Sequence, residues 1–98
     1  MTRQKLTPVH PGEVLQHDFL HPFQLSPADL AQRIRLDQTL VQFILDQQAP
    51  ITANIALRLS LFFGTSPEVW MNLQSRYDLE IARDNLEEQL ATEIRPYP

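Results

Sequence analysis

The 98-residue sequence predicts an all-α domain of five helices with an extended C-terminal helix. Two observations predict this fold class. A serine followed directly by proline, which favours a helix start, occurs at Ser26-Pro27 and again at Ser66-Pro67. Apolar residues then recur at helical spacing, and no segment shows the alternation of a strand. A chain of 98 residues is long enough for one core but not for two.

The first helix is predicted from Gly12 to His21, after a polar, proline-containing N-terminal arm over residues 1–11. Proline lacks a backbone N–H and clashes with the preceding helical turn, so Pro22 is expected to end this helix. Its apolar residues lie near helical spacing: Val14, Leu15, Phe19 and Leu20.

The next two helices are short and close together. Ser26 as N-cap, Pro27 at the first helical position and Asp29 at the third predict the start of a helix that ends at Ile34. After a three-residue turn, a further helix is predicted over Gln38–Leu45. Two short helices joined by a tight turn match the outline of a helix-turn-helix.

The last two helices complete the chain. Thr52 is a suitable N-cap for the fourth and Gly64 a suitable C-cap, with these residues inward: Ile55, Ala56, Leu59 and Phe62. Ser66 starts a long fifth helix with two apolar stripes: Trp70, Leu73, Tyr77 and Ile81 on one, and Leu79, Ala82, Leu86 and Leu90 on the other. We expect a helix-turn-helix domain over residues 12–76, then a C-terminal helical extension and short tail over residues 77–98.

The net charge of −4 is unevenly distributed. Residues 1–76 contain six basic and six acidic side chains, so the whole surplus lies in residues 77–98. Neutralisation of phosphates provides most non-specific affinity for DNA, so a neutral body predicts weak binding by one subunit. Functional DNA binding would need basic side chains clustered on one surface, and two subunits.

The outer side of the Gln38–Leu45 helix is the candidate DNA-reading surface, since the second helix of this motif enters the major groove. Glutamine can pair with adenine, threonine can contact a base edge, and helix N-terminal amides and arginines can hold phosphates. A plain helical bundle with solvent-facing glutamines satisfies the same periodicity. The candidate DNA-binding residues are Arg33, Arg35, Gln38, Thr39 and Gln42.

The long last helix needs a partner for its apolar stripe. Leu79, Leu86 and Leu90 predict either a dimer or partner interface, or packing back onto the core. Trp70 is expected to be a core or interface anchor. The acidic outer face of this helix would suit a basic partner.

Other chemistry has little support. His17 and His21 share a helix face as in a zinc motif, but a catalytic glutamate is lacking and Pro22 follows directly. We expect neither a catalytic site nor a metal or other cofactor; a metal-dependent enzyme would depend on this pair alone. The absence of cysteine and of an apolar run near 18 residues favours a cytoplasmic protein without a membrane partner.

From about residue 10 to residue 83, the chain resembles the HigA/VapI branch of the XRE (phage-repressor-like) helix-turn-helix family. These segments show the resemblance: His10-Pro11-Gly12-Glu13-Val14-Leu15, Phe19-Leu20, Leu25-Ser26, Leu30-Ala31, Ile51-Thr52, Ala56-Leu57-Arg58-Leu59, Phe63-Gly64-Thr65-Ser66-Pro67, Trp70-Met71-Asn72-Leu73-Gln74 and Tyr77-Asp78-Leu79.

The resemblance implies a dimeric antitoxin that binds its operator DNA and neutralises a HigB-like ribonuclease toxin of the RelE type. One residue and two short stretches depart from the family pattern. Arg35 stands where glycine is frequent, the stretch from Gln38 to Gln42 lacks the family's arginine, and Asp46–Pro50 replaces a basic loop. A protein-interaction module that keeps the fold without reading DNA is the alternative.

Overall fold

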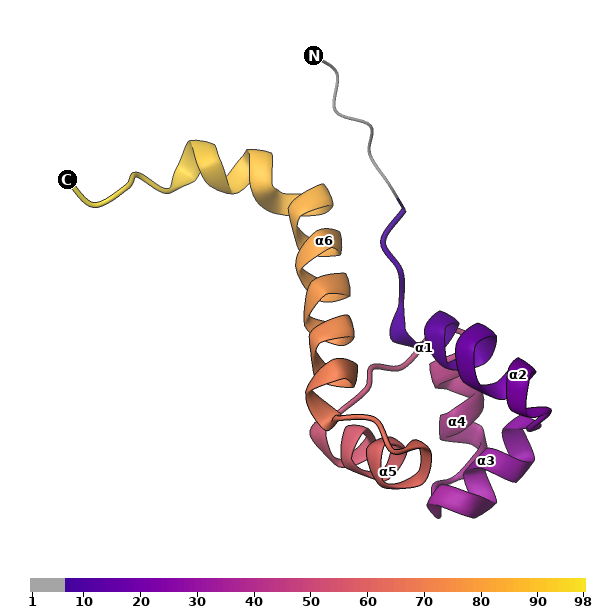
Figure 1. The fold of residues 1–98 in the computed structure, drawn as a ribbon. Coiled ribbons are helices and arrows are strands. Elements are labelled where there is room, and N and C mark those ends of the chain that lie inside the picture. Colours follow the sequence, from indigo (N-terminus) through magenta and orange to yellow (C-terminus); the bar gives the residue numbers. More distant parts are fainter. Residues whose placement is uncertain (1–6) are drawn as a thin grey trace.

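A computed structural model describes residues 7–98, which form five helices and no strand in that range (Figure 1). The prediction of an all-α, five-helix chain is confirmed. The first helix is continuous and consists of α1, η1 and α2. The elements follow in this order: α1 (Pro11–Val14), η1 (Leu15–Leu20), α2 (His21–Phe23), α3 (Pro27–Ile34), α4 (Gln38–Leu45), α5 (Ala53–Phe63) and α6 (Pro67–Glu93).

The predicted helix starts of α3, α5 and α6 are present as side-chain caps. The hydroxyls of Ser26, Thr52 and Ser66 each accept the backbone N–H three residues later, at 3.0, 3.3 and 3.3 Å. At α3 the carboxylate of Asp29 also accepts the backbone N–H of Ser26, at 3.2 Å, which completes a capping box. These bonds satisfy amides that a helix start otherwise leaves unpaired.

Pro22 does not end the first helix, so that prediction was wrong. The turn before it, η1, is a π-helix, and the backbone N–H of His21 donates to the carbonyl of Gln16 five residues earlier. A π-turn is wider than an α-turn and so makes room for a proline ring. The helix ends instead at Gln24, whose backbone is left-handed with φ 55°.

The first helix also begins earlier than predicted. His10 and Pro11 are buried, although the sequence places them in the polar arm. The imidazole Nδ1 of His10 accepts the N–H of Gly12 at 2.9 Å and so caps α1. Its ring meets Tyr77 of α6 edge-on, with centroids 4.8 Å apart. Residues 1–6 of the predicted arm lie outside the described residues.

Burial lowers the pKa of His10 from its ordinary value of 6.5, against the opposing effects of the Asp78 charge and a hydrogen bond to the backbone of Ala49. As pH falls through 6.5 the unfolded chain therefore takes up this proton before the folded one. The stability that neutral His10 contributes is therefore fully present above pH 6.5. It decreases as the pH falls from 6.5 to the lower pKa of His10 in the folded state.

We therefore expect unfolding midpoints in urea to fall between pH 8 and pH 5.5, and to fall less in the His10→Asn variant. Asparagine can cap the helix but does not titrate. The exposed His17 and His21 are common to both proteins and cancel in the comparison. An equal pH dependence in the two proteins would show that His10 is not responsible.

One core lies between the helices. Trp70 is 0% exposed, so of its two predicted roles it has the one in the core, and its prediction as an interface residue is corrected. In α5, Ile55, Ala56 and Leu59 of the predicted inward set are buried, but Phe62 is exposed and Phe63 packs against the core instead. The buried apolar residues are Leu15, Leu20, Leu30, Ala31, Ile34, Val41, Ile44, Ile51, Ile55, Ala56, Leu59 and Trp70.

The long helix α6 extends well beyond this core, and its C-terminal part bends away from the other helices (Figure 1). The described chain consequently measures 51 × 28 × 23 Å along its principal axes. The predicted boundary between residues 76 and 77 lies within the unbroken α6. In the part of the chain that the structure describes, every helix is too short or too polar to cross a membrane.

Candidate nucleic-acid interface

The turn between α3 and α4 is closed by a left-handed residue. Arg35 has φ 55° and ψ 50°, a region that glycine occupies more easily than any other residue. Its conformation allows the N–H of Leu36 to donate to the carbonyl of Ala31 at 2.9 Å, which ends α3. The helix-turn-helix therefore forms with arginine at the position where the family pattern has glycine.

Arg58 of α5 stabilises this turn by hydrogen bonds, a role that sequence analysis did not identify. Its Nη1 donates to the carbonyls of Ile34 and Arg35, each at 2.9 Å, and its Nε donates to Asn54 at 2.7 Å. The positive charge thus lies at the C-terminus of α3, where the helix dipole is negative. A signal was present, since Arg58 is the only charged residue of α5.

The two faces of α4 differ sharply. Val41 and Ile44 are buried, while the predicted residues Gln38, Thr39 and Gln42 are exposed. Residues three or four apart share a helix face, so the structure brings these three polar side chains onto one outer surface. Their grouping is what the sequence predicted.

Close backbone packing holds α4 against the first helix. Gly12 lies against the carbonyl oxygen of Ile44, where any Cβ on residue 12 would overlap that oxygen. This contact between Gly12 and the Ile44 carbonyl sets the distance between α1 and the C-terminal half of α4.

The N-terminus of α4 does not offer the free amides that the sequence predicted for phosphate binding. Asp37 is the N-cap, and its Oδ1 accepts the N–H groups of Thr39 at 2.8 Å and Leu40 at 3.4 Å. The carboxylate thereby uses these donors and adds a negative charge at the same place. Of the groups predicted to hold phosphates, the side chains of Arg33 and Arg35 are exposed and remain candidates.

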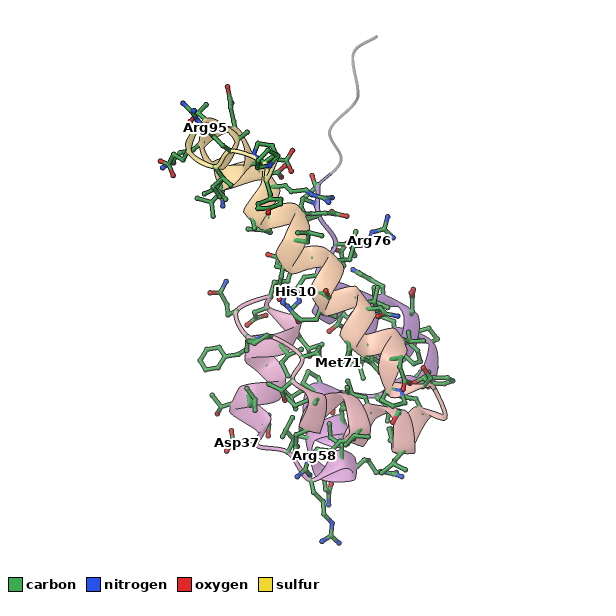
Figure 2. All side chains as sticks on the ribbon, turned by 90° about the vertical axis from the view of Figure 1, so that its left-hand side faces the viewer. His10, Asp37, Arg58, Met71, Arg76 and Arg95 are labelled. Atoms are coloured by element: carbon green, nitrogen blue, oxygen red, sulfur yellow. The ribbon has the colours of Figure 1, made fainter. Side chains whose placement is uncertain are left out.

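Asp37 and Arg58 both lie at the end of the molecule opposite Arg95 (Figure 2). The N-terminal end of α4, which Asp37 caps, is thus at the opposite end of the molecule from Arg95 of the C-terminal segment. At the other end of α4, Gln42 Nε2 donates to Asp46 Oδ1 at 3.0 Å. This bond holds the Gln42 amide in one orientation and leaves its oxygen free to accept.

The histidine pair shows no metal-ligating group around it. The rings of His17 and His21 lie 5.4 Å apart by centroid, edge to face. Among residues 7–98 there is no group of three or more histidine, cysteine or carboxylate side chains placed to hold a metal ion.

The helix order and the polar outer face of α4 define a helix-turn-helix protein of the phage-repressor-like class. No protein-family model matches the chain. It is 35% identical over 83 residues to virulence-associated protein I of Dichelobacter nodosus, covering 85% of this chain and 77% of that protein. The chain belongs to the HigA/VapI family of helix-turn-helix antitoxins.

Solved structures agree with this assignment. The antitoxin HigA of Pseudomonas aeruginosa, solved with the higBA promoter, matches with a TM-score of 0.90 and 42% identity, over 93% of this chain and 99% of that one. A HigA-family addiction module antidote protein from Coxiella burnetii matches with a TM-score of 0.89 and 38% identity, over 94% and 100%. The two solved structures are antitoxins by name, and further relatives are named as an antitoxin and as a helix-turn-helix transcriptional regulator, which confirms both the resemblance and the prediction of a protein that is not an enzyme.

Proposed function

We propose that this antitoxin binds its own operator through the outer face of α4 and so represses its own transcription. The observation that supports this most directly is the exposure of Gln38, Thr39 and Gln42 on one face of the second helix of a helix-turn-helix. Amides and hydroxyls are the groups that pair with base edges in the major groove. The structure of the related Pseudomonas aeruginosa HigA with the higBA promoter supports the same partner. A DNA partner would place the chain in the cytoplasm.

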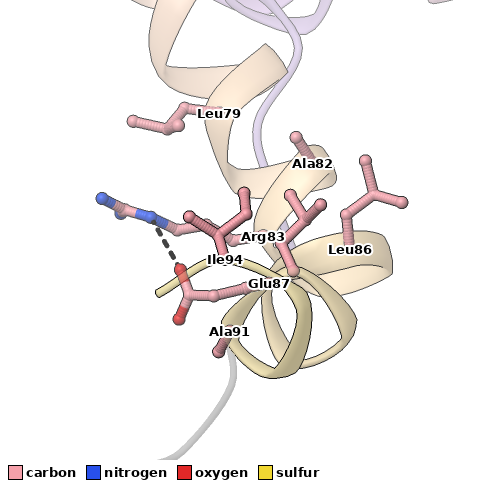
Figure 3. A pocket seen from close by; sticks show the side chains of 8 residues that line it. Leu79, Ala82, Arg83, Leu86, Glu87, Ala91 and Ile94 are labelled. Atoms are coloured by element: carbon pink, nitrogen blue, oxygen red, sulfur yellow. Dashed lines mark ion pairs between the residues drawn. The ribbon is translucent and has the colours of Figure 1, made fainter. Parts of the chain in front are cut away.

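Binding by a homodimer is part of this proposal. Leu79, Leu86 and Leu90 of α6 are 50, 46 and 40% exposed. They line a groove of about 410 Å³, together with Ala82 and Ile94 (Figure 3). An apolar stripe on a helix that leaves its own core gains free energy by packing on a second copy. Two subunits would also double the phosphate contacts of a chain whose body is neutral.

Neutralisation of a HigB/RelE-like ribonuclease toxin completes the proposed function. It is supported by membership of an antitoxin family and by the exposed acidic residues of α6. A basic toxin would be attracted to this end of the molecule, and the DNA to the other. The groove also contains the ion pair between Arg83 and Glu87, at 3.4 Å, so its rim is charged (Figure 3).

Gln38→Ala and Gln42→Ala are each expected to weaken binding to the DNA upstream of the gene by about 1–3 kcal/mol, because each amide can make two bonds to adenine. Fluorescence anisotropy at several salt concentrations measures the loss. Arg33→Ala is the matched control. Because its guanidinium would bind a phosphate rather than a base, this substitution should weaken binding to operator and scrambled DNA alike and make the salt slope shallower.

Specific binding that survives both glutamine substitutions would show that another surface reads the DNA. The second candidate function, a protein-interaction module, is favoured by one observation: the Asp37 carboxylate occupies the N-terminus of α4. Binding of the toxin without any specific complex on operator DNA at low salt would establish that alternative instead.

A further inference from the structure

One large apolar side chain shares the outer face of α4 with the polar residues. Phe43 is 50% exposed, one turn after Thr39 and next to Gln42. Exposure alone would mean little, since several large apolar side chains are exposed in this chain. The position of Phe43 on the second helix of the helix-turn-helix is what distinguishes it.

The phenyl ring of Phe43 is not part of the core. Val41 and Ile44 fill the inner side of α4, and Leu40 and Leu45 beside them are partly buried. The backbone at Phe43 is nevertheless well held, because its carbonyl accepts the N–H of Gln48 at 2.7 Å where the chain turns out of the helix. A phenyl ring is thus presented outward from a fixed backbone position.

The neighbours of the ring narrow the choice of partner. Gln42 is bonded to Asp46, and Phe43 lies one turn after Thr39, so an oriented amide and an apolar ring both belong to the outer side of α4. In the major groove every base edge presents polar atoms, and the only apolar group is the 5-methyl group of thymine. An apolar ring on a helix side that also presents an amide able to pair with adenine is therefore suited to the methyl group of a thymine.

We propose that Phe43 is a specificity-determining residue that contacts the 5-methyl group of a thymine in the operator. The inference depends on the proposed function, in which the outer face of α4 enters the major groove. It adds a residue outside the polar set and a base that this residue selects.

The test replaces each thymine of the operator duplex in turn by deoxyuridine, which removes the methyl and keeps the base pairing. The full-length wild-type chain should lose about fourfold in affinity at one thymine of each half-site, the factor expected for one buried methyl group. Phe43→Ala should bind the thymine operator more weakly and no longer distinguish the two bases at that position. Phe43→Leu should keep part of the discrimination.

Phe23→Ala is the matched control, because it also removes an exposed phenyl ring but lies on α2. It should retain the methyl preference, and thermal unfolding by circular dichroism verifies that each variant is folded. If wild type and Phe43→Ala show the same ratio of affinities for the thymine and deoxyuridine operators, the proposal is overturned. It is also overturned if Phe43→Ala no longer self-associates while this ratio stays unchanged. A wild-type chain that binds no operator overturns the proposed function as well, whereas specific binding without any methyl dependence overturns this inference alone.

Discussion

Trp70→Ala is expected to lower the free energy of unfolding by about 3–5 kcal/mol, the cost of removing a large aromatic side chain from a core. The side chain is fully buried and its ring centroid lies 5.2 Å from that of Phe19 in η1. Its Nε1 donates to Thr65 Oγ1 at 2.9 Å, which ties the start of α6 to the preceding loop. The substitution therefore removes both the apolar contacts of Trp70 in the core and its hydrogen bond to the loop before α6.

Urea unfolding followed by circular dichroism measures this loss, since Trp70 is the only tryptophan and its fluorescence disappears with it. Trp70→Phe keeps much of the apolar volume and loses the bond to Thr65, so it should cost clearly less. Leu61→Ala, at a side chain that is 86% exposed, should change stability by no more than about 0.5 kcal/mol. A cost below about 1 kcal/mol for Trp70→Ala would contradict the full burial of this side chain.

Gly12→Ala is expected to destabilise the fold by about 1–3 kcal/mol or more, because the added methyl would overlap the carbonyl oxygen of Ile44. Helix propensity alone predicts the opposite sign, since alanine is favoured over glycine by about 1 kcal/mol inside a helix. The sign of the effect therefore distinguishes tertiary packing from local preference. The obstacle is backbone, which cannot move aside without shifting α4.

Gly64→Ala provides a control with different physics. Gly64 has φ 76° and nothing within 4 Å of an added Cβ, so only backbone strain is expected there, at about 1 kcal/mol. Both variants are compared by thermal unfolding and by operator binding below the transition. We expect Gly12→Ala to weaken operator binding even where it is folded, because α4 must shift, and Gly64→Ala to leave it unchanged. A Gly12→Ala protein as stable as wild type would refute the close approach.

The helix-turn-helix could be placed from sequence because its ends depend on neighbouring residues. Ser26 and Asp29 cap α3 through bonds that span three residues, and the observed ranges Pro27–Ile34 and Gln38–Leu45 are those predicted. The inward and outward faces of α4 followed from helical periodicity for the same reason. Phe62 and Phe63 show where periodicity fails, because adjacent apolar residues leave the inward one undecided.

Two of the errors concern features that the sequence pattern leaves open. Pro22 is accommodated by the π-turn of η1, which no local propensity announces. The role of Asp37 is local, but the same residue type at a helix start serves equally as a cap or as an exposed charge, and only geometry shows that it uses the amides of Thr39 and Leu40. The candidate phosphate contacts are consequently no longer the backbone amides at the start of α4 but the side chains of Arg33 and Arg35.

By itself, the sequence determined the class of fold, the caps that start α3, α5 and α6, and the polar set on α4, because caps and periodicity act within a few residues. The tertiary structure alone decided that Trp70 is internal, that Gly12 lies against Ile44, and that Arg58 holds the turn at Arg35, 23 residues away. These features depend on contacts between helices that are distant in the chain. Their energies come from shape and desolvation, which a linear pattern does not record.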